Sequence, residues 1–135
     1  VEAFVTLTCV SNPIGGDLAG NARWLGLPVR EVLAMAGPLA GADMVLSRSA
    51  DGFTASTPLP VLTDDRDAML AVGMNGEPLP DVYDGPLRLR ADSQHGYKMV
   101  KWVHRIEWIH DYHDVGDGQG GSREDSGLQH FDARA

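Results

Sequence analysis

The only cysteine of the chain, Cys9, lies where a predicted strand ends and a loop begins. The β-branched, apolar residues 5–8 predict the strand, and residues 11–13 (Ser-Asn-Pro) end it before a Gly-Gly pair. A thiol at a strand end beside a polar loop can meet a ligand that arrives from solvent. The alternative is that Cys9 is a small buried hydrophobic residue, the commoner role of a lone cysteine.

Cationic side chains recur in the second half of the chain. The alternation of residues 87–90 (Leu-Arg-Leu-Arg) puts Arg88 and Arg90 on one face of a strand, and Lys98 and Lys101 follow soon after. A guanidinium suits bidentate contact with phosphate, and an ammonium supplies a point charge. From the residues alone a solvated strand face is the favoured interpretation, and binding of an anionic ligand is the alternative.

A second group of side chains could ligate a metal. His110, Asp111, His113 and Asp114 stand close together, and a loop could bring the two histidines to one ion. A third well-spaced ligand is lacking, so solvated residues at a strand end are the favoured interpretation. We expect His104, on the face that carries Trp102 and Trp108, to be a core histidine.

The elements that must position these residues follow from periodicity and turn residues. Apolar positions 29, 32, 33 and 36 predict a short helix that has Pro28 in its first turn and is stopped by Gly37-Pro38. Further strands are predicted over residues 21–27, 42–47, 53–57, 69–74 and 101–109. Asp51-Gly52 and Asn75-Gly76 mark hairpin turns, and Thr63-Asp64-Asp65 is expected to form a helix cap before a short turn over residues 66–68. This pattern predicts a mixed α+β fold that is mostly β.

Length and charge limit the function. The 135 residues suit one domain, and a net charge of −8 makes nucleic acid an improbable partner. The glycine-rich, polar residues 116–135 lack the pattern of a core element, so we predict a domain over residues 1–115 and a loosely held tail.

The sequence resembles the molybdopterin-binding domain of the sulfite oxidase family over nearly its whole length. The resemblance rests on phrases in the family's order and spacing: TLTCVSN and GNARWLG (residues 6–12 and 20–26), SADGFTASTPL (49–59), LAVGMNGEPLP (70–80), GPLRL (85–89) and GYKMVKWVHRIEW (96–108). It implies an oxidoreductase of the two-electron, oxygen-atom-transfer type, in which a molybdenum-molybdopterin cofactor carries the redox chemistry.

The resemblance also implies roles for particular residues. Cys9 matches the one protein ligand of molybdenum, which explains how a single cysteine can suffice when the pterin sulfurs supply the rest. Arg88 and Lys101 match cofactor-binding cations, and the other candidates for cofactor binding are Asn12, Asp51, Tyr83, Lys98, Met99 and Val100. Asn12 could instead make the turn, and the Asp51-Gly52 pair could arise for backbone reasons alone.

The sequence departs from the family's pattern at several positions. Tyr83 stands where the family has a histidine, and Phe53 lies near the position of a catalytic tyrosine in sulfite-oxidising members, which argues against sulfite as the substrate. The family's segment before the cysteine is not in this sequence, so the resemblance implies an N-terminally truncated and potentially inactive domain. A cofactor-free structural or interaction domain that retains the fold is the alternative function.

The final phrases, GYKMVKW and GDGQGGSRED, look most like those of bacterial members. That similarity implies a haem or membrane partner for electron transfer. It also implies an extracytoplasmic or membrane-associated location for the full-length protein.

Overall fold

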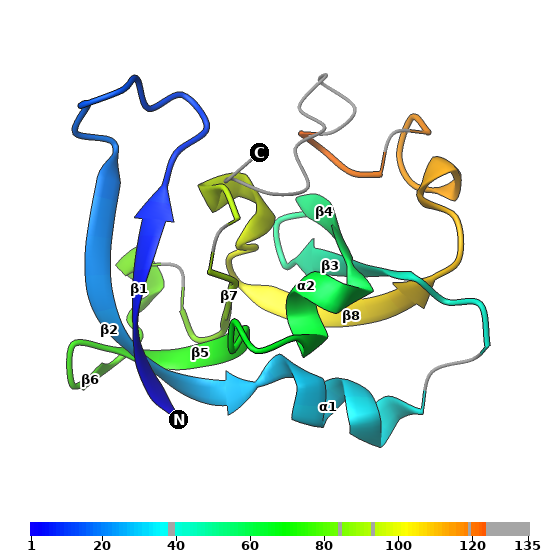
Figure 1. Cartoon of the computed structure of the whole chain (residues 1–135), viewed down its shortest axis with the longest axis horizontal. Helices are drawn as coiled ribbons and strands as arrows, with labels where there is room; N and C mark the ends of the chain where they lie inside the picture. The colour runs from blue at the N-terminus through cyan, green and yellow to red at the C-terminus, as the bar shows by residue number, and fades with distance from the viewer. Residues whose placement is uncertain (38–39, 84, 93, 119, 124–135) are drawn as a thin grey trace.

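Two antiparallel sheets and two short helices make up the fold of this computed structural model (Figure 1). The structure describes residues 1–37, 40–83, 85–92, 94–118 and 120–123, and for Tyr112 the backbone only. The predicted α+β fold, mostly β, is confirmed. No helix among these residues has the length and apolar character needed to cross a membrane.

The larger sheet carries Cys9. Its strands are β1 (Glu2–Thr8), β2 (Ala19–Pro28), β5 (Met69–Met74), β6 (Glu77–Pro78) and β7 (Arg88–Arg90), with β2 and β7 on either side of β5. Val5 and Trp24 point inward from β1 and β2, whereas Phe4 and Leu25 alternate with them and are exposed. The predicted strand before Cys9 is thus confirmed, and pairing with β2 holds it.

The smaller sheet has the order β4-β3-β8, with β3 (Met44–Ser49) between β4 (Thr54–Pro58) and β8 (Val103–Ile109). The predicted Asp51-Gly52 turn joins β3 to β4, and Gly52 has a φ of 94° there. At the Asn75-Gly76 turn, both residues have positive φ, which is the requirement of a type I′ hairpin. Strand β8 begins two residues later than predicted because Trp102 has a φ of 43°, outside the β region.

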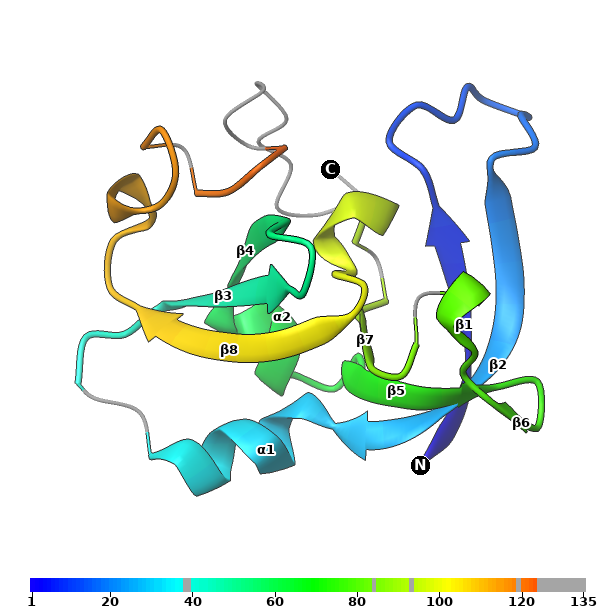
Figure 2. The same ribbon diagram turned by 180° about the vertical axis from the view of Figure 1, so that it is seen from behind.

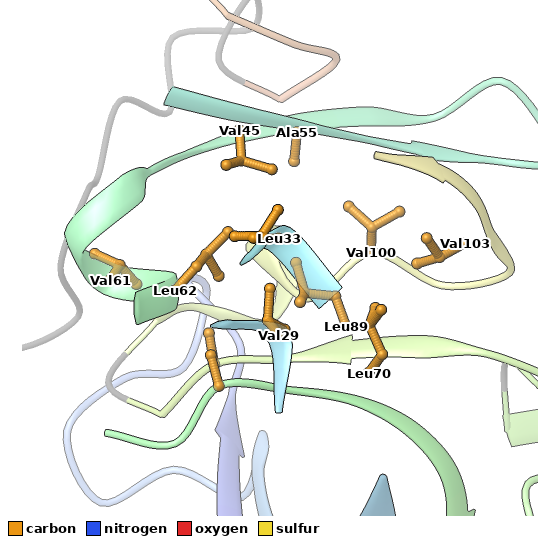
Figure 3. Packing of buried hydrophobic residues seen from close by; sticks show 12 residues of the cluster. Val29, Leu33, Val45, Ala55, Val61, Leu62, Leu70, Leu89, Val100 and Val103 are labelled. Carbon is orange, nitrogen blue, oxygen red and sulfur yellow. The ribbon is translucent and has the colours of Figure 1, made fainter. Parts of the chain in front are cut away.

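The main core lies between the sheets and the helices (Figure 3). Helix α1 (Val29–Ala36) confirms the predicted helix, with Pro28 as its N-cap instead of in its first turn. It buries Val29 and Leu33 and ends at Gly37, which has a left-handed φ of 62°. Helix α2 (Leu59–Thr63) contributes Val61 and Leu62. In the described part of the chain, three short 3₁₀ helices complete the fold: η1 (Asp81–Tyr83), η2 (Gly96–Lys98) and η3 (Tyr112–Asp114).

Two local predictions are wrong. Thr63 ends helix α2, which begins earlier than the predicted turn because Pro60 can occupy the first turn of a helix as well as end a strand. Residues 66–68 are not helical, although Asp64, part of the predicted cap, accepts from the Arg66 N–H at 3.1 Å. His104 is exposed and not a core histidine. The opposite face of β8 is the one that packs inward at this point, through Val103.

The chain after η3 also differs from a simple tail. Gly120 and Gly121 are buried, and Ser122 is hydrogen-bonded to Thr54 at the start of β4. Residues 120–123 therefore lie against the domain, while residues 119 and 124–135 fall outside the described ones. Figures 1 and 2 show the segment with η2 between the β1–β2 hairpin and β4.

Candidate functional site

A cavity of about 520 Å³ opens beside Cys9, within the roughly 300–1,000 Å³ typical of small-molecule sites. Segments far apart in the sequence form its walls: the end of β1, the β3–β4 turn, β7, the η2 region and residue 123. The lining residues are Leu7, Cys9, Ser49, Asp51, Phe53, Arg88, Gly96, Tyr97, Met99, Val100, Lys101, Trp102 and Arg123.

Backbone hydrogen bonds on both sides fix the position of Cys9. Its N–H donates to the carbonyl of Leu18 at 3.0 Å, and its carbonyl accepts from the N–H of Asn12 at 3.0 Å. Thr8, one residue earlier, bridges to His95 in parallel fashion, which ties the end of β1 to the segment that leads into η2. The Cys9 thiol is free, half-buried and part of the cavity wall.

The cavity is cationic although the chain is acidic. Arg88, Lys101 and Arg123 line it, whereas Asp51 is the one carboxylate among the lining residues that the structure describes. Arg88 is buried, and its guanidinium lies 6.0 Å from the centroid of the Trp24 ring. A wall with three cations, one carboxylate and a thiol suits an anionic ligand that also offers a soft metal.

Arg90, on the same strand as Arg88, contacts residues of the cavity wall without lining the cavity itself. It is buried, its guanidinium lies 4.2 Å from the centroid of the Trp24 ring, and it donates to the Met99 sulfur and to the Val5 carbonyl. Burial foremost, and then the charge of Arg88, lower the pKa of Arg90 to about 9, while Asp92 opposes the shift. Arg90 is thus still protonated at neutral pH. Its two hydrogen bonds join Val5, on the strand that leads to Cys9, to Met99, which lines the cavity.

Asp51 has a defined backbone role as well as a place in the cavity. Its carboxylate accepts from the Phe53 N–H at 3.0 Å, which closes the β3–β4 turn. Hydrogen bonds, from the Ser49 hydroxyl foremost and then from the Phe53 N–H, lower the pKa of Asp51 below 3.8. The group is therefore a fixed negative charge at physiological pH.

This shift makes a prediction about acid stability. A carboxylate whose pKa is lowered in the folded state stabilises that state above the unfolded pKa, and the contribution disappears as the pH falls through the folded pKa. We expect Asp51→Asn to lower the urea midpoint slightly at pH 6, and we expect this difference from the unsubstituted chain to shrink as the pH falls below the unfolded pKa of an aspartate. Urea titrations over this range test it; an equal difference at every pH would contradict it.

The structure brings six of the predicted site residues together in the cavity: Cys9, Asp51, Arg88, Met99, Val100 and Lys101. It places three others elsewhere. Asn12 accepts from the Leu18 N–H at 2.8 Å within the loop, Tyr83 is 54% exposed on η1, and Lys98 is buried with its Nζ donating to the Ser56 carbonyl at 2.6 Å.

The predicted histidine cluster does not form a metal site within the described ranges. His113 pairs instead with Asp111 at 2.6 Å, and Nδ1 of His110 is hydrogen-bonded to the Gly41 carbonyl. The His113 N–H and side chain lower the pKa of Asp111. The solvated interpretation of these residues thus agrees with their exposure.

Several cavity residues were missed by reasoning from the sequence. Tyr97 and Trp102 lie inside the GYKMVKW phrase but carry no signal beyond their place in it. Arg123 was assigned to the tail, although it belongs to the GDGQGGSRED phrase. Ser49 and Gly96 were also missed; a Cβ at position 96 would lie 3.0 Å from Leu7 Cδ2, so the end of the Leu7 side chain would have to shift.

A mostly β domain with a thiol and cations around one cavity can bind an anionic ligand beside a thiol. Residues 1–115 match the family described as the oxidoreductase molybdopterin binding domain, and the chain belongs to this family. The fold also resembles the sulfane dehydrogenase SoxCD of Paracoccus pantotrophus, with a TM-score of 0.75 and 24% identity over 82% of this chain and 32% of that one.

Curated relatives agree with this assignment. The chain is 33% identical to the mitochondrial sulfite oxidase of Drosophila melanogaster and 31% identical to the NADPH nitrate reductase of Fusarium oxysporum, in each case over 68% of its length. It is 31% identical to the sulfite oxidase of Gallus gallus over 78%. It spans 18%, 12% and 28% of these relatives' own lengths, respectively.

Proposed function

We propose that this chain is the cofactor-binding domain of a molybdenum-dependent oxidoreductase that transfers an oxygen atom with two electrons. The observation that carries the proposal is the meeting of the free Cys9 thiol with Arg88 and Lys101 in one cavity. When bound, the cofactor would supply the two-electron chemistry, and the chain supplies binding, orientation and electrostatics.

The residues present fit such a cofactor. The molybdenum cofactor offers a metal that binds thiolates and a terminal phosphate, and the cavity offers one thiol and a set of cations. Cys9 would hold the metal, while Arg88 and Lys101 would hold the phosphate. Met99 and Val100, both buried, would shape the wall between them, and Asp51 would face the polar part of the pterin.

The chain's own residues also limit the reaction. Phe53 lines the cavity without a hydroxyl, so it can exclude water but cannot move a proton, and this supports a substrate other than sulfite. A bacterial origin, a haem or membrane electron acceptor and an extracytoplasmic location are part of the same proposal. They rest on the similarity of residues 96–125 to bacterial members of the family.

Molybdenum analysis tests the proposal. The chain is produced in a host that makes the cofactor, both alone and within its full reading frame, and is assayed for molybdenum and for pterin fluorescence after acid release. We expect near-stoichiometric molybdenum in the longer form at least. Its absence from both forms would overturn the proposal in favour of a structural or interaction domain that retains the fold.

A further inference from the structure

The glycine-rich segment after η3 has a defined path back to the cavity. Gly120 and Gly121 are buried, with φ values of 110° and 152°. Residues with a Cβ rarely adopt such values, so the glycines at these two positions serve the backbone conformation. The glycine-rich composition from which we predicted a loose tail instead allows the backbone to make a tight turn at these two positions.

Ser122, the next residue, is hydrogen-bonded to Thr54, the first residue of β4. We call this pair of residues the Ser122–Thr54 clasp. The Ser122 N–H donates to the Thr54 carbonyl at 2.9 Å, and the Ser122 Oγ accepts from the Thr54 N–H at 3.0 Å. The two hydroxyl oxygens are also 3.3 Å apart. These three hydrogen bonds join residues 68 positions apart and set where the chain goes next.

Arg123 follows the clasp directly and lines the cavity. It lies beyond residues 1–115, the part of the chain that matches the family, so the family does not assign it. With Arg88 on β7 and Lys101 after η2, it supplies a third cation from a third segment of the chain. Multiple cations at one wall suit a tetrahedral oxyanion, which presents several acceptor oxygens.

We propose that Arg123, held in place by the Ser122–Thr54 clasp, binds a tetrahedral oxyanion in the cavity together with Arg88 and Lys101. The ligand is either the terminal phosphate of the cofactor or an oxyanion substrate. The inference rests on the proposed function, because it assigns a new binding residue to the same cavity. Residues 120–123 are accordingly a wall of the site.

Titration of the cofactor-free chain with inorganic phosphate, followed by calorimetry or amide NMR shifts, tests the inference. Arg123→Ala should weaken phosphate binding by about fivefold, and Arg123→Lys should restore most of the affinity. Ser122→Ala removes no charge, yet it should weaken binding by about twofold because it loosens the clasp. Arg30→Ala, which removes a cation outside the cavity where Arg30 pairs with Asp67, is the matched control.

The inference is overturned if Arg123→Ala weakens phosphate binding no more than Arg30→Ala does, or if Ser122→Ala binds phosphate like the unsubstituted chain. Because Ser122 and Arg123 are exposed, unfolding is not expected, and circular dichroism verifies this. The chain could bind phosphate through Arg123 and yet never retain molybdenum. That result would support the anion site and contradict the proposed function.

The cofactor-loaded protein distinguishes the two sources of the oxyanion. Faster loss of molybdenum from Arg123→Ala on dialysis would assign Arg123 to the cofactor phosphate. Unchanged retention, with weaker binding of added phosphate to the loaded protein, would assign it to the substrate position. If Arg123→Ala shows neither of these two effects relative to Arg30→Ala, the assignment of Arg123 to the anion site is overturned.

Discussion

Cys9→Ser is expected to reduce molybdenum retention at least tenfold in whichever form of the protein retains the metal. A thiol has a pKa near 8.5 and readily becomes a thiolate on a metal, whereas a serine hydroxyl stays protonated and is a harder ligand. The substitution changes one atom in a half-buried side chain, so the fold should persist. Metal analysis after gel filtration measures the effect.

Ser11→Ala is the matched control for Cys9→Ser, since Ser11 lies exposed in the same loop and outside the cavity. Its molybdenum content should equal that of the unsubstituted protein. Equal molybdenum in Cys9→Ser and the unsubstituted protein would show that the thiol is not the ligand. Cys9 would then be the small apolar residue that most lone cysteines are.

Gly26→Ala should lower the free energy of unfolding by about 3 kcal/mol, at the upper end of the usual effect of overpacking. Gly26 lies at the irregularity where β2 changes register against β5. A Cβ there would overlap the Leu70 carbonyl and lie 2.9 Å from Ala71 Cα. These are backbone atoms in a paired strand, so they cannot move aside without disturbing the pairing. Urea denaturation measures the change.

Gly20→Ala provides the comparison within the same strand. No atom lies within 4 Å of the Cβ that this substitution would add. The expected effect is neutral or slightly stabilising, because alanine loses less conformational freedom on folding. Similar losses of stability in the two variants would show that strand propensity, and not the approach of β5, decides the effect at Gly26.

Local chemistry let the sequence predict most elements. The helix over Val29–Ala36 ends at Gly37 as predicted, and the strand over Met69–Met74 has the predicted bounds because Asn75-Gly76 ends it. The alternation that places Arg88 and Arg90 on one face is confirmed by their shared contact with Trp24. Such features depend on residues a few positions apart.

Burial was harder to predict. Lys98 and Lys101 look alike in sequence, yet Lys98 is buried against the Ser56 carbonyl while Lys101 is exposed in the cavity wall. His104 shares an alternating face with the tryptophans, but it is exposed at the beginning of β8. Which side of a segment faces the core depends on what packs against it, and those partners are distant in the chain.

The sequence by itself determined that Cys9 stands at the end of a strand, that its motifs resemble one family, and that cations are available. Only the tertiary structure decided which of these side chains lie together around one cavity. The cavity joins Cys9, Asp51, Arg88, Lys101 and Arg123, and it sets Asn12, Tyr83 and Lys98 apart from them. The physical reason is that strand pairing and the Ser122–Thr54 clasp fix distances between segments, which spacing along the chain does not encode.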